Sequence, residues 1–515
     1  MSRNSKITTV LLRLTFGFAL FAPHAAGAAP DCSALEELQV ADMRITKVSA
    51  HEAKDPDAAA VSRCQAEGVI GEEIGFVMVL PEKANWNGKF FMAGVGGFAG
   101  SYDFRGLIPA LNEGYAAVMT NTGHTASGVR ADWAHNDLER LVNYGYLGVH
   151  RTAVTAKAIV REFYGGAPEY SYFSGCSNGG RQAMMEAQRY PEDFDGIIAG
   201  APAHDFTGIM AAFVYNSQRI FPDPDDVRSP IITPDNRKLL QSTILEQCDA
   251  DDGVEDGILD DPRLCGFEVS SLPLCADDKP APHCLTVAQR EAIEAVYGGP
   301  RSQGGPIFRG LPFGAENEPT GWEGWITGPN KNMLEAYNEP SLQFAFGTQG
   351  FKYLFLGDPN WDYSDYDLSS FEQDVERIRS TVDAVDPALS GLKAAGGKMI
   401  LWHGWSDAAL TALASIDYYE AARSLDPGVS EYLRFYLLPG VHHCVGGPGP
   451  DRVDWLQALE NWVERDQAPG ALTASRIRDG EETMTRPVCV YPERAVYQGS
   501  GDVDDAANFK CQLPE

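Results

Sequence analysis

Short runs of hydrophobic residues alternate with helical patterns through the first two hundred positions of the chain. The apolar runs expected to form buried strands occupy 75–80, 89–93, 115–121 and 197–201, and another ends at 172–173. Hydrophobic residues recur with helical spacing over 147–164, and 181–189 is expected to be a further helix. Strands that alternate with helices predict a parallel, doubly wound sheet.

This alternation is interrupted in the middle of the chain. Residues 203–395 are rich in proline, glycine, aspartate and aromatic residues and contain few clean strand patterns, and apolar runs resume at 398–403 and 433–438. A strand–helix–strand unit needs only about 30 residues, so most of the interval is predicted to be an insertion. We therefore predict a lid domain at 203–395, inserted into an α/β domain whose two parts are 29–202 and 396–515.

The first 28 residues have the three parts of a secretion signal. Basic residues come first (Arg3, Lys6 and Arg13), an apolar run follows at 14–21, and a small-residue cleavage motif ends at Ala28. The apolar run is too short to span a bilayer, and no later run approaches twenty apolar residues. We expect residues 1–28 to be removed and the mature protein to be secreted or periplasmic.

The chain is strongly acidic, with a formal net charge of −31 that becomes −34 once the three basic signal residues are removed. Such a charge argues against nucleic acid or an anionic membrane as a partner. Hydrophobic residues make up 44% and charged residues 22% of the chain, a balance typical of a globular protein with a sizeable core.

Ten cysteines are present, and an even number in an exported chain favours disulfide bonds over a metal or redox site. Proximity along the chain suggests four pairs and leaves two cysteines for each other: Cys32–Cys64, Cys248–Cys265, Cys275–Cys284, Cys489–Cys511 and Cys176–Cys444. The sequence alone does not fix this pairing. If Cys176 and Cys444 are bonded, their neighbours Ser177 and His443 lie side by side.

Residues 175–179, Gly-Cys-Ser-Asn-Gly, form a G-x-S-x-G motif between an expected strand and an expected helix. Such an elbow holds its serine in a strained backbone conformation, and the flanking glycines avoid collisions with neighbouring backbone. The free N–H groups at the start of the helix can stabilise an oxyanion. A nucleophile at Ser177 is the leading interpretation, and an ordinary glycine-rich turn is the alternative.

A candidate acid and a candidate base follow two later strands. Asp407 comes just after the strand at 398–403, and His443 comes just after the strand at 433–438. Serine, then acid, then histidine is the chain order of the α/β-hydrolase triad. His403 and His442 are competing candidates for the base.

The glycine-rich loop at 94–100 follows the expected strand at 89–93. It lacks the Lys-Ser/Thr pair of a phosphate-binding loop. Its position before the elbow suits the second oxyanion donor, which α/β-hydrolases take from an early strand–helix loop. A simple flexible loop is the alternative.

An acidic segment at 248–258 lies within the predicted lid. Its carboxylates repel one another unless they are solvated or neutralised, and Asp249, Asp252 and Asp256 with the intervening carbonyls offer an oxygen-rich cage for calcium. The spacing excludes an EF-hand, because a loop that starts at Asp252 places Arg263 where the bidentate glutamate belongs. A solvated acidic loop is the alternative.

Several motifs together resemble the tannase and feruloyl esterase family over nearly the whole mature chain. These motifs lie at 175–181, 248–258, 261–263, 403–408, 443–449 and 499–502. The resemblance implies an α/β-hydrolase fold with a large inserted lid domain. It also implies that Ser177 is the nucleophile, His443 the base and Asp407 the residue that orients this base, with an oxyanion hole made by the N–H groups of Gly97 and Asn178.

The same resemblance implies a structural calcium ion and supports one disulfide. The calcium ligands would be the carboxylates of Asp249, Asp252 and Asp256 and the carbonyls of Val254 and Ile258, and the disulfide would be Cys176–Cys444. Some members of the family hydrolyse mono(hydroxyethyl) terephthalate and are expected to hold its free carboxylate with a lid arginine. Residues 321–358 of this chain contain no arginine.

These features predict an esterase that acts on esters of aromatic acids, of the feruloyl, galloyl or chlorogenate type, through an acyl-enzyme. Aromatic residues of the lid are candidates for stacking on a planar acyl group, and two or three of them are expected to touch it: Trp322, Trp325, Phe344, Phe346, Phe351, Tyr353 and Trp361. A terephthalate half-ester hydrolase is the first alternative. A non-catalytic, calcium-stabilised secreted binding protein is the alternative from another class.

Overall fold

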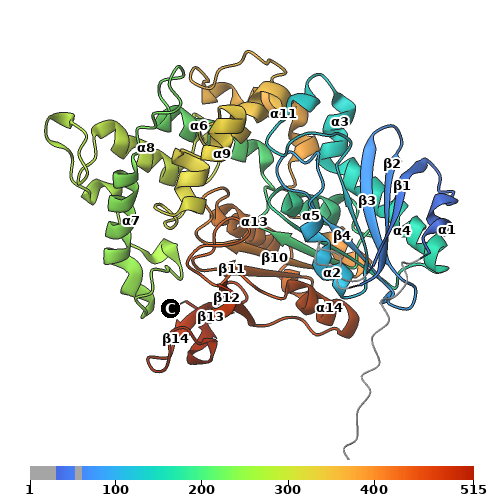
Figure 1. The fold of residues 1–515 in the computed structure, drawn as a ribbon. Coiled ribbons are helices and arrows are strands. Elements are labelled where there is room, and N and C mark those ends of the chain that lie inside the picture. Colours follow the sequence, from blue (N-terminus) through green and yellow to red (C-terminus); the bar gives the residue numbers. More distant parts are fainter. Residues whose placement is uncertain (1–30, 53–60, 515) are drawn as a thin grey trace, which may run out of the picture.

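The computed structural model describes residues 31–52 and 61–514, so the predicted signal peptide lies outside the described residues. At its centre is a nine-stranded mixed sheet with the order β1-β2-β3-β5-β4-β6-β7-β10-β11 (Figure 1). Its strands are β1 Met43–His51, β2 Arg63–Ile70, β3 Ile74–Pro81, β4 Lys89–Ala93, β5 Ala116–Thr120, β6 Tyr170–Cys176, β7 Gly196–Gly200, β10 Lys398–Gly404 and β11 Leu433–Leu438. With its helices on both faces, this sheet forms an α/β-hydrolase fold.

The sheet is parallel from β5 to β11 and antiparallel at the other edge. The pairs β1–β2, β2–β3 and β3–β5 are antiparallel, which corrects the prediction of a wholly parallel sheet. Only residues 71–73 connect β2 to β3, and a connection this short permits only antiparallel pairing. The strand β1 gave no clear signal because it is largely exposed and carries charged residues.

Helices cover both faces of the sheet. One hydrophobic core lies between the sheet and α4 Gly148–Tyr164, α5 Asn178–Arg189, α12 Ser390–Ala395 and α13 Ala412–Leu425. The core on the opposite face involves α2 Ile108–Asn112 and α14 Trp455–Arg465. The amphipathic pattern of α4 buries one stripe, including Ala153, Ala156 and Val160, and the helix ends before Gly165, whose φ of 84° is a left-handed conformation that glycine accommodates without strain.

A third hydrophobic core joins the lid helices to the loops at the carboxyl ends of the strands. The lid helices, grouped together in Figure 1, are α6 Phe206–Ile220, α7 Pro234–Cys248, α8 Val287–Gly298, α9 Lys331–Tyr337, α10 Leu342–Gln349 and α11 Phe371–Val382. Phe98 and Leu410, from two of those loops, pack in this core with Phe206 of α6. The insertion therefore covers the end of the sheet where the expected catalytic residues lie. The domain boundaries themselves stay predictions.

The remaining elements are short. They are α1 Ser33–Glu36, α3 Leu138–Val142 and three small hairpins, β8 Arg301–Ser302 with β9 Gly305–Pro306, β12 Leu472–Arg478 with β13 Glu481–Val488, and β14 Arg494–Tyr497 with β15 Phe509–Gln512. The sequence patterns did not reveal the two C-terminal hairpins. Within the described ranges, no helix combines the length and the apolar composition needed to cross a membrane.

Five disulfide bonds are present, and they join the same five pairs that proximity along the chain suggested. Four of them close loops of 9 to 32 residues. The fifth, Cys176–Cys444, spans 268 positions and joins the end of β6 to the loop after β11.

Candidate active site

Ser177 occupies a sharp turn between β6 and α5. Its backbone has φ 65° and ψ −124°, a strained conformation for a residue with a side chain, as the elbow motif predicts. Its N–H donates to the carbonyl of Gly200 on the neighbouring strand at 3.0 Å. A Cβ atom at Gly175 would lie 2.5 Å from the carbonyl of Gly179, so the strand and helix approach this closely only because glycine is present.

His443 is held by the carboxylate of Asp407. The Nδ1 atom of His443 lies 2.8 Å from Oδ2 of Asp407, whose other oxygen accepts hydrogen bonds from the N–H groups of Ala409 and Leu410. Burial alone would raise the pKa of Asp407, but the charge of His443 and the hydrogen bonds from His403 and His443 hold it below its usual range. An ionised Asp407 accepts a hydrogen bond from Nδ1 of His443, which leaves Nε2 as the nitrogen that can accept a proton.

The two competing histidines have other partners. His403 is buried beneath Asp407, with Nδ1 2.8 Å from the hydroxyl of Ser415 and Nε2 3.3 Å from Asp407 Oδ2. His442 pairs through Nδ1 with the hydroxyl of Thr320 at 2.7 Å, and burial lowers its pKa. Neither ring lines the cavity that contains Ser177, so the geometry favours His443 over both of them.

One cavity brings the predicted groups together. It is lined by Gly97, Phe98, Ser177, Asn178, Ala203, Phe206, Ile209, Met210, Phe213, Trp325, Phe346, Ala409, Leu410 and His443. Apart from Ser177, Asn178 and His443, its lining side chains are apolar. Its volume is only about 30 Å³, and a water molecule needs roughly 10–15 Å³ measured in this way.

Gly97 faces this cavity from the loop between β4 and α2. Its φ is 57°, and a Cβ atom there would lie 2.3 Å from the carbonyl of Gly128. Among the described residues, neither the N–H of Gly97 nor that of Asn178 has a hydrogen-bond acceptor. The side-chain amide of Asn178 donates to the carbonyl of Val95 at 2.8 Å, which ties the glycine-rich loop to the elbow. Two unpaired N–H groups beside a serine can stabilise an oxyanion.

The sequence motif contained Arg181, but its structural role was not foreseen. This fully buried guanidinium donates to the Asn178 side chain at 2.8 Å and to three backbone carbonyls, those of Tyr144, Gly145 and Val382, at 2.8–3.0 Å. It also lies over the ring of Tyr144, 4.7 Å from its centroid. Arg181 therefore connects the elbow to the end of α11, about 200 positions away in the sequence.

Two of the seven proposed lid aromatics line the cavity, Trp325 and Phe346. Their rings are nearly parallel with centroids 6.2 Å apart, and the rings of Trp325 and His443 are roughly perpendicular with centroids 4.9 Å apart. Trp322, Phe344 and Phe351 are buried in the lid core, while Tyr353 and Trp361 are partly buried against it. Phe98, Phe206 and Phe213 line the cavity although sequence patterns did not single them out, because nothing local distinguishes a ring beside substrate from a core ring.

The acidic segment retains the oxygen chemistry expected of a calcium site. The carbonyls of Val254 and Ile258 accept no hydrogen bond from the described residues, and burial raises the pKa of Asp252 to about 6. Nearby Asp260 is buried with its Oδ2 atom unpaired, and burial raises its pKa to about 7. Arg486 neutralises only Asp256, at 2.9 Å. The three carboxylates of Asp249, Asp252 and Asp256 do not converge on one point among the described residues, and calcium stays a prediction.

Comparisons with known proteins show the family and the fold. The model of the family described as "Tannase and feruloyl esterase" matches residues 58–512. An uncharacterized esterase of Xanthomonas campestris is 33% identical, over 98% of this chain and 94% of the relative. Mono(2-hydroxyethyl) terephthalate hydrolase of Piscinibacter sakaiensis is 32% identical, over 89% and 86%. The crystal structure of feruloyl esterase B from Aspergillus oryzae superposes with a TM-score of 0.82 at 24% identity, over 92% and 98%, which shows a common fold.

Proposed function

This chain belongs to the tannase and feruloyl esterase family and is a carboxylic ester hydrolase, and from that premise we propose that it cleaves esters of aromatic acids of the feruloyl, galloyl or chlorogenate type. The observation that carries the proposal is the apolar cavity shared by Ser177, His443 and the N–H groups of Gly97 and Asn178. The alternative of a non-catalytic binding protein is set aside because the chain belongs to a family of esterases.

The proposed chemistry has two steps. His443 takes the proton of the Ser177 hydroxyl as the oxygen attacks the ester carbonyl, and the N–H groups of Gly97 and Asn178 stabilise the resulting oxyanion. The protonated His443, stabilised by Asp407, then gives its proton to the leaving alcohol. In the second step His443 takes a proton from water as the water attacks the acyl-enzyme carbonyl. His443 then returns the proton to the Ser177 oxygen, and the acid is released.

The lining of the cavity favours an uncharged acyl group. Among the described residues, no lysine or arginine lines it, so a free carboxylate on the acyl ring would be buried without a partner. This disfavours a terephthalate half-ester as the preferred substrate. The half-buried pair Trp325 and Phe346 are the candidates for contact with a planar acyl ring.

We further propose a stabilising role for calcium and an extracytoplasmic location. A serine nucleophile needs no metal to activate it, so the ion would act only on the fold. A secreted or periplasmic location is supported by the five disulfides, which persist in oxidising compartments.

A substrate panel tests the proposal. We would measure kcat/KM for methyl ferulate, methyl gallate, chlorogenate and mono(2-hydroxyethyl) terephthalate, with Ser177→Ala as the inactive control. The three esters with an uncharged acyl group, methyl ferulate, methyl gallate and chlorogenate, should be the better substrates, and all turnover should be lost in Ser177→Ala. A higher kcat/KM for mono(2-hydroxyethyl) terephthalate than for each of the other three esters would refute the proposed specificity.

A further inference from the structure

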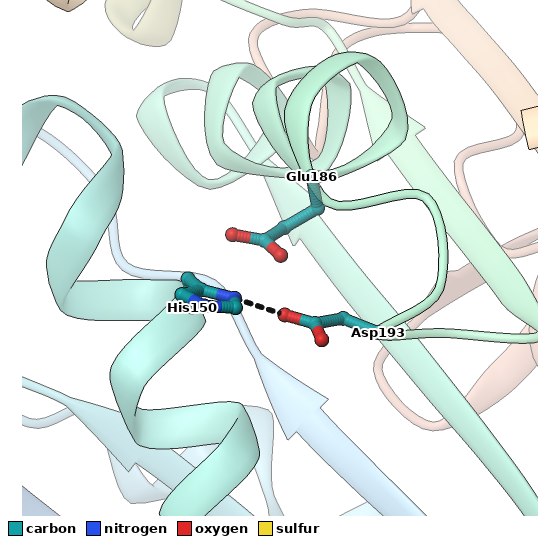
Figure 2. A group of neighbouring side chains, drawn as sticks. All are labelled: His150, Glu186 and Asp193. Carbon is teal, nitrogen blue, oxygen red and sulfur yellow. Dashed lines mark hydrogen bonds and ion pairs between the residues drawn. The ribbon is translucent and has the colours of Figure 1, made fainter. Parts of the chain in front are cut away.

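A second group of chemically active side chains lies away from the cavity, on the face of the sheet covered by α4 and α5. His150 comes from the first turn of α4, Glu186 from the last turn of α5 and Asp193 from the segment before β7. One ligand atom from each residue lies within 4.8 Å of the other two, and Figure 2 shows the three side chains pointing toward one another. In the part of the chain that the structure describes, no other group of three metal-ligating side chains converges this closely.

The three side chains differ in how well their polar atoms are paired. Nδ1 of His150 lies 2.6 Å from Oδ2 of Asp193, and the imidazole stacks on Tyr190 with ring centroids 3.8 Å apart, which fixes its orientation. Glu186 is only 1% exposed, and its Oε2 atom has no hydrogen-bond partner. A buried carboxylate oxygen without a donor is costly, and the Glu186 carboxylate lies on the side of the helix that faces His150 and Asp193 (Figure 2).

The local charge leaves the group short of cations. Lys157 donates to the backbone carbonyl of Asp193, and the carboxylates of Asp193, Asp195 and Glu186 all act on its ammonium group. Glu186 and Asp193 therefore lie together with one ammonium group beside them.

We propose that His150, Glu186 and Asp193 bind a divalent transition-metal ion, with zinc as the ion best suited to one imidazole nitrogen and two carboxylates. Zinc takes nitrogen and carboxylate oxygen ligands at about 2.0–2.2 Å, so the present His150–Asp193 contact opens slightly as the ion enters. The His150 side chain is 28% exposed, which gives the ion a path from solvent and leaves room for a water ligand. Calcium suits the group poorly, since it prefers oxygen ligands only.

The bound ion would act on the fold rather than on the chemistry. Glu186 lies eight residues after Asn178 in α5, which places it about 12 Å along the helix from the elbow. The ion would cross-link α5 to α4 and to the approach of β7, two elements that fix the elbow helix against the sheet. This site is also distinct from the predicted calcium site in the acidic segment at 248–258, which contains no histidine.

Zinc titration of the purified protein in saturating calcium tests the inference, with metal content and Tm as readouts. The wild type should bind one zinc ion at this group and gain about 2–3 °C in Tm at a free concentration about 100 times Kd. Glu186→Gln keeps the size of the side chain but removes its negative charge, so it should fold normally but lose about tenfold or more in zinc affinity. His150→Gln should lose zinc affinity likewise.

His283→Gln is the matched control, since it removes an exposed histidine of the lid and should leave zinc binding unchanged. A wild type that binds no more zinc than the His150→Gln variant would overturn the inference. Undiminished zinc affinity in Glu186→Gln would overturn it as well, and would indicate that Glu186 is instead a protonated acid that donates to Asp193.

Discussion

The Cys176–Cys444 disulfide makes a prediction that separates catalytic positioning from global stability. The bonded cysteines precede Ser177 and follow His443 directly, so one covalent bond fixes the distance between elbow and histidine loop. Ser177 and Cys444 both have positive φ values, 65° and 66°. Each such conformation costs on the order of 1–3 kcal/mol and persists only where its surroundings enforce it. We therefore expect this bond to enforce the active geometry.

The expected magnitudes follow from the loops that the bonds close. A chain-entropy estimate gives roughly 5–6 kcal/mol for a loop of 268 residues and about 3 kcal/mol for the 9-residue loop closed by Cys275–Cys284. These values are upper limits, because measured gains commonly fall short of the estimate. The rate effect is separate, since a shift of about 1 Å between nucleophile and base costs roughly a hundredfold.

The perturbation is the double variant Cys176→Ala/Cys444→Ala, with Cys275→Ala/Cys284→Ala as the matched control. Circular dichroism at 25 °C should show both variants folded, supported by four remaining disulfides each. Turnover of para-nitrophenyl acetate should fall roughly a hundredfold in the first variant and stay near the wild-type rate in the control. Wild-type kcat/KM in the Cys176→Ala/Cys444→Ala variant would show that the rest of the fold positions the site, and the reasoning would fail.

Three further predictions concern buried charges and metal. Arg181→Met should lower the free energy of unfolding by about 4–8 kcal/mol in urea, because four buried acceptors lose their donor. The control is Arg219→Met, which removes one hydrogen bond to a backbone carbonyl. Equal losses of unfolding free energy in the two variants would refute the prediction. Burial lowers the pKa of His124 to about 4, so the unfolded state binds the proton more tightly. The free energy of unfolding should therefore fall by about 3 kcal/mol as the pH is lowered from 6.5 toward 4. A His124→Gln variant whose unfolding free energy falls as much as that of the wild type would contradict the prediction. Removal of calcium with a chelator should lower the Tm of the wild type, and the Asp252→Ala variant should not respond to the chelator. If the purified protein contains no calcium and the chelator leaves its Tm unchanged, the segment at 248–258 is a solvated acidic loop.

The parts of the fold that the sequence predicted are those with strong local signals. The strands β4 and β11 have the expected bounds because they are short apolar runs bounded by turn residues. The elbow at Ser177 was found because only glycine permits its close backbone contacts, and such constraints leave a readable motif. Strand β1 was not predicted at all, because a half-exposed edge strand has no continuous apolar run.

The parts that could not be predicted depend on contacts between distant segments. Arg181 bonds Val382 across 201 positions, and the His150 group combines three elements whose separate sequences carry no motif. The cavity lining shows the same limit. Trp325 and Trp322 lie three positions apart in one aromatic segment, yet Trp325 meets His443 while Trp322 is fully buried in the lid core. Such differences arise from packing, which local periodicity does not encode.

The most direct test of the account is to identify the residue that forms the covalent intermediate. The protein would be incubated with a fluorophosphonate, which traps activated serines, and mapped by peptide mass spectrometry alongside His443→Ala and His442→Ala variants. The account predicts a single label on Ser177 in the wild type and in His442→Ala, and no label in His443→Ala. A label on another residue, or efficient labelling of Ser177 in His443→Ala but not in His442→Ala, would contradict it.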